Sequence, residues 1–235
     1  MEHTSYLERR EQIEHYFDRT AAKAWEVLTS NAPVGRIRRT VREGRDQMRA
    51  TILSWLPQDM RGIRLLDAGC GTGALATEAM RRGADVVAID LSPTLIQLAR
   101  ERSINDYQNG YGHIEFLAGD MLDTSVGQFD YVIAMDSLIH YDTPDIVKAF
   151  SNLAQRTRKS VIFTFAPRTP LLAVMHRLGR LFPKSERSPS LEPVLQSELL
   201  HQLMALPHAS DWKAGQTVRI NSGFYKSQVW EWVRA

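Results

Sequence analysis

One glycine-rich segment has the residue types and the spacing needed to hold a nucleotide. Residues 67–73 read Asp-Ala-Gly-Cys-Gly-Thr-Gly and fall between a short apolar run and a helical pattern. Glycines permit a tight turn and let the backbone approach a ligand closely. Asp90 lies 21 residues after Gly69, at the end of the next apolar run, where a carboxylate can accept hydrogen bonds from both ribose hydroxyls. Together these features predict a nucleotide cofactor.

The loop alone does not say which cofactor binds, because Gly69, Gly71 and Ala74 also satisfy the dinucleotide fingerprint G-x-G-x-x-G/A. A nicotinamide enzyme therefore stays open at this point. Three features favour S-adenosylmethionine. The aspartate before the glycines resembles the D-x-G-x-G-x-G loop of methyltransferases. A Gly-Asp-Met segment at 119–121 follows the third predicted strand, where such enzymes bind adenine, and the chain ends in a predicted hairpin.

The elements that must position this loop alternate regularly after Gly62. Strand patterns occupy residues 63–67, 84–90, 113–117, 129–135 and 160–165. Helical patterns lie between them, the later ones at 93–102 and 146–157, and a further helix is predicted at 195–206. Such alternation predicts a doubly wound, Rossmann-like α/β sheet with helices on both faces. Strands at 217–221 and 224–233 would close it as an antiparallel hairpin.

The first residues look different, because two stretches with helical apolar spacing precede the first strand, separated near Pro33. We expect residues 1–57 to form a helical cap or arm and residues 58–235 a methyltransferase domain. Within that domain, residues 168–193 would form an inserted helical lid.

Composition excludes several classes of protein. The chain has 235 residues, a formal net charge of +2 and one cysteine, so no disulfide can form within it and a reducing compartment fits. No apolar run is long enough to span a membrane, and no signal-peptide pattern opens the sequence. We expect a cytoplasmic protein that does not bind nucleic acid.

Several segments outside the loop resemble one enzyme family in the same order along the chain. They are His15-Tyr16-Phe17 near the N-terminus, Leu-Ile-His-Tyr at 138–141, Phe-Ala-Pro-Arg-Thr-Pro-Leu-Leu at 165–172 and Ser-Gly-Phe-Tyr at 222–225. The chain resembles the magnesium-protoporphyrin IX O-methyltransferases of bacteriochlorophyll synthesis over essentially its whole length. The resemblance implies methyl transfer from S-adenosylmethionine to a propionate of magnesium protoporphyrin IX, with magnesium present only as part of that substrate.

The resemblance also implies roles for individual residues. Asp67 and the backbone of Gly69, Gly71 and Gly73 would hold the methionyl end of the cofactor. The remaining cofactor-binding residues would be Asp90 at the ribose, Leu91 and Met121 at the adenine, Asp120 at its amino group, and Met135. His140 and Tyr16 are the expected catalytic residues. The expected substrate-binding residues are Trp25, Tyr141, Arg168, Met175 and Tyr225.

Alternatives accompany the catalytic assignments. His140 could bond the propionate, approach the magnesium of the substrate, or pack under the lid without a catalytic role. Tyr16 neighbours an apolar stripe, so it could belong to the core. The chemistry requires little acid–base help, because a propionic acid with a pKa of about 4.3 is already an anion at neutral pH.

Basic side chains are unevenly distributed. Arg38, Arg42, Arg45 and Arg49 share one helical face. That stripe could be solvated, or it could contact the second propionate, a partner protein or an anionic membrane surface. The segment 170–182 is also basic and amphipathic, and it could cap the domain, lie on a membrane or act as the lid.

The resemblance suggests the magnesium chelatase subunit that delivers the porphyrin as a partner, and peripheral contact with the photosynthetic membrane. The rival interpretations are a methyltransferase for a quinone precursor or another small carboxylate, and a cofactor-binding regulatory or carrier protein without catalysis.

Overall fold

The chain folds around one seven-stranded sheet in the order β3-β2-β1-β4-β5-β7-β6. The structure is a computed structural model, and it describes residues 6–20, 27–29, 33–104, 112–168 and 191–235. The strands are β1 (Arg64–Ala68), β2 (Asp85–Asp90), β3 (His113–Ala118), β4 (Phe129–Ala134), β5 (Thr157–Phe165), β6 (Trp212–Ser222) and β7 (Tyr225–Arg234). β1 to β5 run parallel, and β7 pairs antiparallel with both β5 and β6. The predicted doubly wound sheet with a closing hairpin is confirmed.

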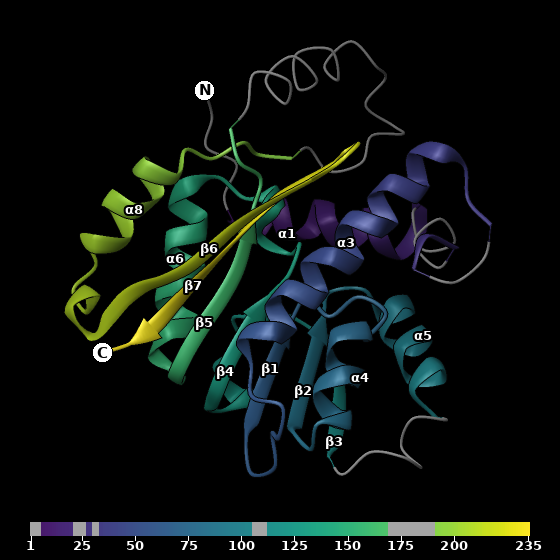
Figure 1. The fold of residues 1–235 in the computed structure, drawn as a ribbon, viewed down its shortest axis with the longest axis horizontal. Helices are drawn as coiled ribbons and strands as arrows, with labels where there is room; N and C mark the ends of the chain where they lie inside the picture. The colour runs from purple at the N-terminus through teal and green to yellow at the C-terminus, as the bar shows by residue number, and fades with distance from the viewer. Residues whose placement is uncertain (1–5, 21–26, 30–32, 105–111, 169–190) are drawn as a thin grey trace.

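Helices cover both faces of the sheet (Figure 1). They are α1 (Tyr6–His15), α3 (Arg36–Trp55), α4 (Ala74–Arg81), α5 (Pro93–Ser103), α6 (Thr143–Gln155) and α8 (Gln196–Met204). Short turns complete the described elements: the π-helix η1 (Tyr16–Thr20) and the 3₁₀ turns η2 (Thr124–Val126), η3 (Leu138–His140) and η5 (Ala209–Asp211). In the part of the chain that the structure describes, no helix is both long and apolar enough to cross a bilayer.

Alternating side chains of the strands build two hydrophobic cores. Leu65 and Ile133 face α3, α4 and α5, whereas Leu66, Val132 and Phe163 face α6 and α8. Because both faces are buried, the parallel strands read as continuous apolar runs, as a doubly wound sheet requires.

Two element boundaries differ from their predictions for physical reasons. The helix predicted at 146–157 begins at Thr143, because Asp142 caps it by accepting a hydrogen bond from Asp145 N. Thr157 instead belongs to β5 and pairs with Phe129. The strand predicted at 217–221 begins earlier, at Trp212, because β6 pairs with β7 from that residue onward. A bulge after Ala214 shifts the register but does not end the pairing.

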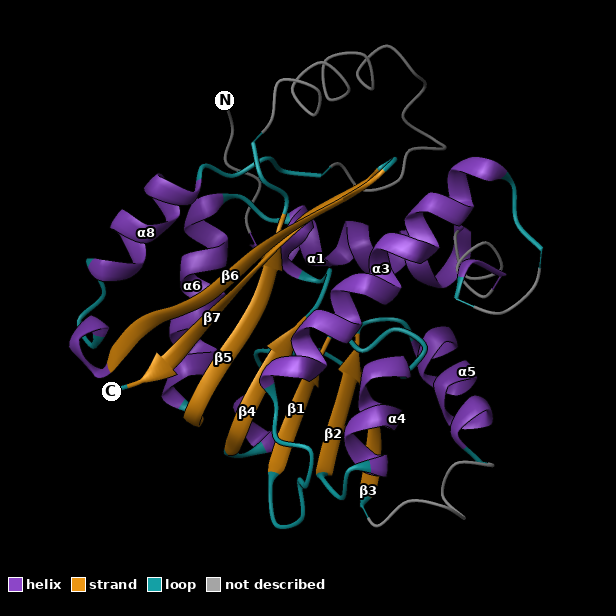
Figure 2. Ribbon diagram, viewed as in Figure 1, coloured by secondary structure: helices purple, strands orange, loops and turns teal. Residues whose placement is uncertain are grey.

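The burial of helix α3 changes along its length. Met48 and Ile52 of α3 are fully buried, but Ile37 in its first turn is 56% exposed. The helix predicted from this apolar spacing is confirmed, but its N-terminal half is less buried than its C-terminal half. Figure 2 shows that the N-terminal half and α1 both lie near the edge toward which the parallel strands point.

Candidate active site

A well-formed cavity opens at the carboxyl ends of the parallel strands and has a volume of about 420 Å³. It lies where the strand order reverses between β1 and β4, the usual ligand position in open α/β sheets. Its walls come from the loops after β1 to β5, from the start of β7, and from α1, η1 and α3. Most of the lining side chains are apolar, and the volume falls within the range of about 300–1,000 Å³ typical of ligand sites.

The glycine loop after β1 has the close-packed form that its sequence predicts. Gly69, Gly71 and Gly73 all have positive φ angles, of 85°, 55° and 76°. A Cβ at Gly69 would collide with Ser137, and one at Gly73 would lie 3.0 Å from the Phe116 ring. The N–H of Gly69 donates to the Ile89 carbonyl at 2.8 Å, which joins the loop to the end of β2.

Asp67 lies beneath this loop with 2% of its surface exposed. Its Oδ2 accepts a hydrogen bond from Ala76 N at 3.1 Å, in the first turn of α4. Burial raises the pKa of the Asp67 carboxyl to about 7; the Ala76 N–H opposes that rise, and nearby Asp90 adds to it. Asp67 does not line the main cavity; it borders a smaller neighbouring one together with Gly69 and Met135.

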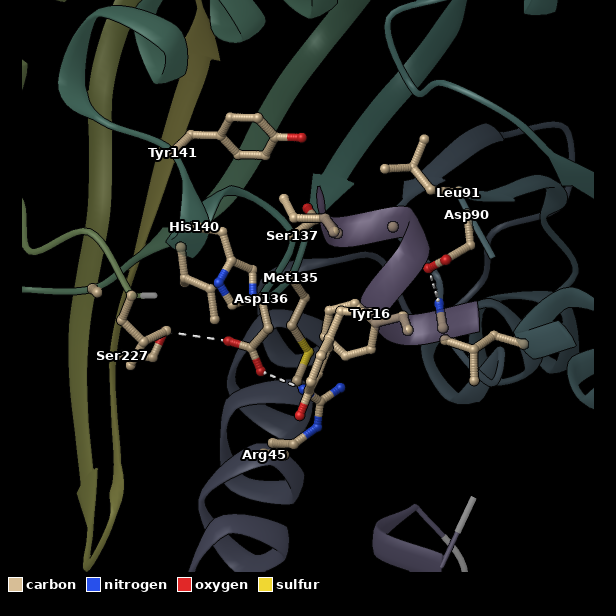
Figure 3. A pocket seen from close by; sticks show the side chains of 18 of the residues that line it. Tyr16, Arg45, Asp90, Leu91, Met135, Asp136, Ser137, His140, Tyr141 and Ser227 are labelled. Carbon is tan, nitrogen blue, oxygen red and sulfur yellow. Dashed lines mark hydrogen bonds and ion pairs between the residues drawn. The ribbon is translucent and has the colours of Figure 1, made fainter. Parts of the chain in front are cut away.

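Asp90 ends β2 and lines the cavity beside Leu91. Its two carboxylate oxygens accept hydrogen bonds from Gly71 N at 2.8 Å and from Ser92 N at 3.0 Å. Burial raises the pKa of Asp90, while these two N–H groups oppose the rise. The carboxylate is thus tied to the glycine loop at one end of the cavity (Figure 3).

Asp120 and Met121 follow β3 and also line the cavity. Helix α1 contacts Asp120 through Tyr6, whose hydroxyl donates to Oδ1 at 2.8 Å, and through Arg10, whose Nη1 donates to Oδ2 at 3.0 Å. The Tyr6 ring stacks on Tyr141 with centroids 5.0 Å apart. Sequence reasoning missed both α1 residues, because their partner lies more than 100 positions away.

The largest omission from the predicted site is Asp136, which directly follows Met135. Arg45 of α3 donates to its Oδ2 at 2.8 Å, and the Tyr225 hydroxyl of β7 donates to its Oδ1 at 2.9 Å. Ser227 and Thr164 add weaker contacts at 3.4 Å. Asp136 also has φ = 56°, a left-handed conformation that aspartate adopts more readily than most residues. Figure 3 shows its carboxylate between Arg45 and Ser227.

The two residues predicted to be catalytic lie in the same cavity. His140 ends the 3₁₀ turn after β4 and is 6% exposed, and Tyr16 opens the π-helix η1. Both side chains line the cavity. Phe17 bridges them: its ring centroid lies 5.2 Å from that of Tyr16 and 6.1 Å from that of His140. In Figure 3, Asp136, His140 and Tyr141 lie across the cavity from Asp90 and Leu91.

The predicted substrate-binding residues are less uniform. Tyr141 and Tyr225 line the cavity but are buried, and Tyr225 packs so tightly on α3 that a Cβ at Gly44 would collide with its ring. Arg168 is exposed, and its N–H donates to the Val194 carbonyl. Trp25, Met175 and most of the predicted lid lie outside the described residues. The described ends of that segment meet at a bridge between Pro167 and Val194, next to the cavity.

The arginine stripe is not simply a solvated face. Arg42 donates to the carbonyls of Leu28 and Val27 at 2.9 and 2.7 Å, and Arg45 pairs with Asp136. Arg49 pairs with Asp46 one turn away. Arg38 is exposed and lines the cavity.

Comparisons with known proteins agree with this fold and site. Residues 65–160 match the model of a general methyltransferase domain, and residues 134–234 match the C-terminus of magnesium-protoporphyrin IX methyltransferases. A magnesium-protoporphyrin O-methyltransferase of Rhodobacter capsulatus is 47% identical over 97% of this chain and 98% of its own. The chloroplastic enzyme of Arabidopsis thaliana is 30% identical over 74% of this chain and 56% of its own.

A solved structure is similar as a whole. The magnesium protoporphyrin IX methyltransferase of Synechocystis, with bound S-adenosylhomocysteine, superposes with a TM-score of 0.84 at 26% identity, covering 97% of this chain and all of that one. Fold, glycine loop and strand-end aspartates together define a class I S-adenosylmethionine-dependent methyltransferase. Within that class, the chain belongs to the magnesium-protoporphyrin O-methyltransferase family.

Proposed function

We propose that this protein transfers the methyl group of S-adenosylmethionine to a propionate carboxylate of magnesium protoporphyrin IX in bacteriochlorophyll synthesis. The observation that carries the proposal is the cavity, with a nucleotide-type loop and Asp90 at one end and an apolar chamber holding His140 at the other. The 47% identity to a named magnesium-protoporphyrin O-methyltransferase supports the acceptor.

The reaction is a direct displacement at the methyl carbon. A propionate oxygen forms the new C–O bond while the methyl–sulfur bond breaks, and the bonding pair stays on sulfur to give neutral S-adenosylhomocysteine. No proton is transferred, since the propionate is already ionised near neutral pH. The protein must therefore align the propionate oxygen, the methyl carbon and the sulfur. It must also exclude water, because a dry site favours a reaction in which an anionic carboxylate and a cationic sulfonium lose their charges.

An assay of radiolabelled methyl transfer tests the function directly. Magnesium protoporphyrin IX should be labelled, and metal-free protoporphyrin compared beside it shows whether the magnesium is required. A ubiquinone precursor belongs in the same assay, because a ubiquinone biosynthesis O-methyltransferase is 27% identical over 72% of this chain. Labelling of the quinone precursor alone would overturn the proposal.

For the cofactor, we assign the methionyl end to Asp67 and the backbone of Gly69, Gly71 and Gly73, and the ribose to Asp90. Leu91 and Met121 would hold the adenine, Asp120 its amino group, and Met135 would also contact the cofactor. Cavity-lining positions at Gly69, Gly71, Asp90, Leu91, Asp120, Met121 and Met135 support this set. Asp67 would act on the α-ammonium group from its buried position.

Binding of S-adenosylmethionine should release a proton from Asp67 below about pH 7. The free protein holds this proton at pH 6, because burial raises the pKa of Asp67 to about 7. A nearby ammonium group favours the carboxylate and lowers its pKa, so the affinity for the cofactor should rise from pH 6 to 7 and then level off. Titration calorimetry in buffers of different ionisation heat measures both quantities. Asp67→Asn should remove the dependence, and a flat wild-type profile would exclude this coupling.

We assign alignment of the propionate to His140 and Tyr16. His140→Ala and Tyr16→Phe should each lower kcat about tenfold or more while changing cofactor affinity little, because a displacement of about 1 Å can cost on the order of 100-fold in rate. Steady-state kinetics with saturating porphyrin, together with cofactor titrations, separate the two effects. His208→Ala, on an exposed turn away from the cavity, is the matched control. Wild-type kcat in both variants would make these residues structural.

The remaining assignments concern the porphyrin and its surroundings. Tyr141, Tyr225, Arg168, Trp25 and Met175 would contact the macrocycle. Residues 1–57 would serve as the cap and residues 168–193 as a movable lid, which the closed bridge at Pro167 and Val194 beside the cavity supports. We also propose contact with the porphyrin-carrying chelatase subunit and peripheral contact with the photosynthetic membrane; binding assays with the purified subunit and with anionic vesicles test them separately.

A further inference from the structure

The charged side chains that line the cavity differ in whether the protein supplies them with a hydrogen-bond or ion-pair partner. Its three carboxylates, Asp90, Asp120 and Asp136, each accept hydrogen bonds from the protein at both oxygens. Among the cations, Arg45 is paired with Asp136. Arg38 and Lys226 also line the cavity, and within the described part of the chain neither side chain has a hydrogen-bond acceptor or an ion-pair partner. No anion among the described residues therefore pairs with either of these two cations.

Arg38 lies on α3 and Lys226 on β7, two elements that pack against each other beside the cavity. The turn between β6 and β7 rests on Thr40, two residues after Arg38: Phe224 N donates to Thr40 Oγ1 at 3.3 Å, and a Cβ at Gly223 would lie 2.6 Å from the same atom. Lys226 follows two residues later, in β7. The proposed cofactor residues Asp90 and Asp120 follow β2 and β3. In the strand order, these two strands lie at the opposite end of the sheet from β7.

The acceptor has a second anion that the reaction does not consume. The two propionates of protoporphyrin IX project from the same edge of a flat apolar macrocycle. When one carboxylate lies in line with the methyl group, the other remains charged in an apolar cavity. Placing a charge there is costly unless a cation pairs with it.

We propose that Arg38 and Lys226 bind the second, non-reacting propionate and so select porphyrins that carry both carboxylates. The assignment rests on the proposed function and names the substrate feature that its site recognises. Arg45 and Arg42 differ from these two cations because they already have protein acceptors: Arg45 pairs with Asp136, and Arg42 donates to two backbone carbonyls. Of the four arginines in the stripe, Arg45 links α3 to the residue after Met135, Arg42 links it to residues 27–28, and Arg49 pairs within α3. Arg38 is the one assigned to the substrate.

The test compares two acceptors and three proteins. The acceptors are magnesium protoporphyrin IX and its half ester, in which only the reacting propionate is free. Methyl-transfer kinetics give KM and kcat for each, and fluorescence quenching gives the Kd. The proteins are the wild type, the double variant Arg38→Gln/Lys226→Gln, and Arg39→Gln as matched control. Arg39 is exposed on the same helix turn but does not line the cavity.

Wild-type protein should bind the diacid roughly threefold to thirtyfold more tightly than the half ester, as two partly exposed ion pairs allow. The double variant should bind both acceptors with similar KM, near that of the wild type for the half ester, and with little change in kcat. Arg39→Gln should match the wild type. Added salt should reduce the wild-type preference.

The proposal fails if the double variant keeps the wild-type preference, or loses affinity equally for diacid and half ester. These outcomes differ from failure of the proposed function. If wild-type protein transfers no methyl group to magnesium protoporphyrin, the function is wrong, whereas normal transfer with an unchanged preference overturns only the assignment of Arg38 and Lys226.

Discussion

Replacing Asp136 by alanine should lower the free energy of unfolding by about 3 kcal/mol, since removing one partner of a buried ion pair typically costs about 3–5 kcal/mol. The Asp136 side chain is 3% exposed, and its removal leaves the donors of Arg45 and Tyr225 without their acceptor. The lower end of the range applies because the Arg45 side chain is 20% exposed. For a domain of this size, the melting temperature should fall by roughly 6–12 °C.

Asp136→Asn is the matched control for this loss. Asparagine tolerates the left-handed backbone at this position as well as aspartate does, and its side-chain oxygen can still accept from Tyr225. It removes only the charge that Arg45 requires, so its destabilisation should be distinctly smaller than that of the alanine variant. Urea unfolding followed by circular dichroism measures both. If alanine costs less than about 1 kcal/mol, the four contacts around Asp136 do not act as a structural centre.

The contrast between Asp136 and the glycine loop shows what a sequence can reveal. The loop was predictable, because its glycines, Asp67 and the periodic strands on either side lie within one continuous stretch. Local backbone requirements are written into local residue types. Asp136 depends on Arg45, Thr164, Tyr225 and Ser227, which approach only when α3, β5 and β7 pack together. Nothing in its immediate neighbours specifies those partners.

The arginine stripe shows a second limit of sequence-based prediction. Helical spacing correctly placed Arg38, Arg42, Arg45 and Arg49 on one helix, but periodicity reports only which residues share a face. It does not report what the face meets. The acceptors of Arg42 are backbone carbonyls, which no side-chain pattern can encode. Likewise, the exposed Ile37 shows that an apolar residue in register with a core face lies outside the core where the helix extends past the sheet.

Replacing Asp90 by alanine should weaken S-adenosylmethionine binding about tenfold to a hundredfold, since a hydrogen bond to a charged group contributes about 1.5–3 kcal/mol. Two effects of the substitution act in the same direction. The cofactor would lose the carboxylate assigned to its ribose hydroxyls. The glycine loop would also lose the acceptor of Gly71 N, although Gly69 N and Cys70 N would still donate to the Ile89 carbonyl, so the loop would be less firmly held for the cofactor.

Asp90→Asn separates these two effects, because an amide oxygen can still accept from Gly71 N but carries no charge for the ribose. Its affinity should fall between those of the wild type and the alanine variant. The fold should survive in both variants, since Asp90 lies at the end of a strand whose buried residues Val87 and Ile89 are unchanged, and circular dichroism checks that. A calorimetric Kd for Asp90→Ala equal to that of the wild type would falsify the ribose assignment. Equal losses in both variants would instead locate the effect in the charge, and would make the tie to the loop unimportant for affinity.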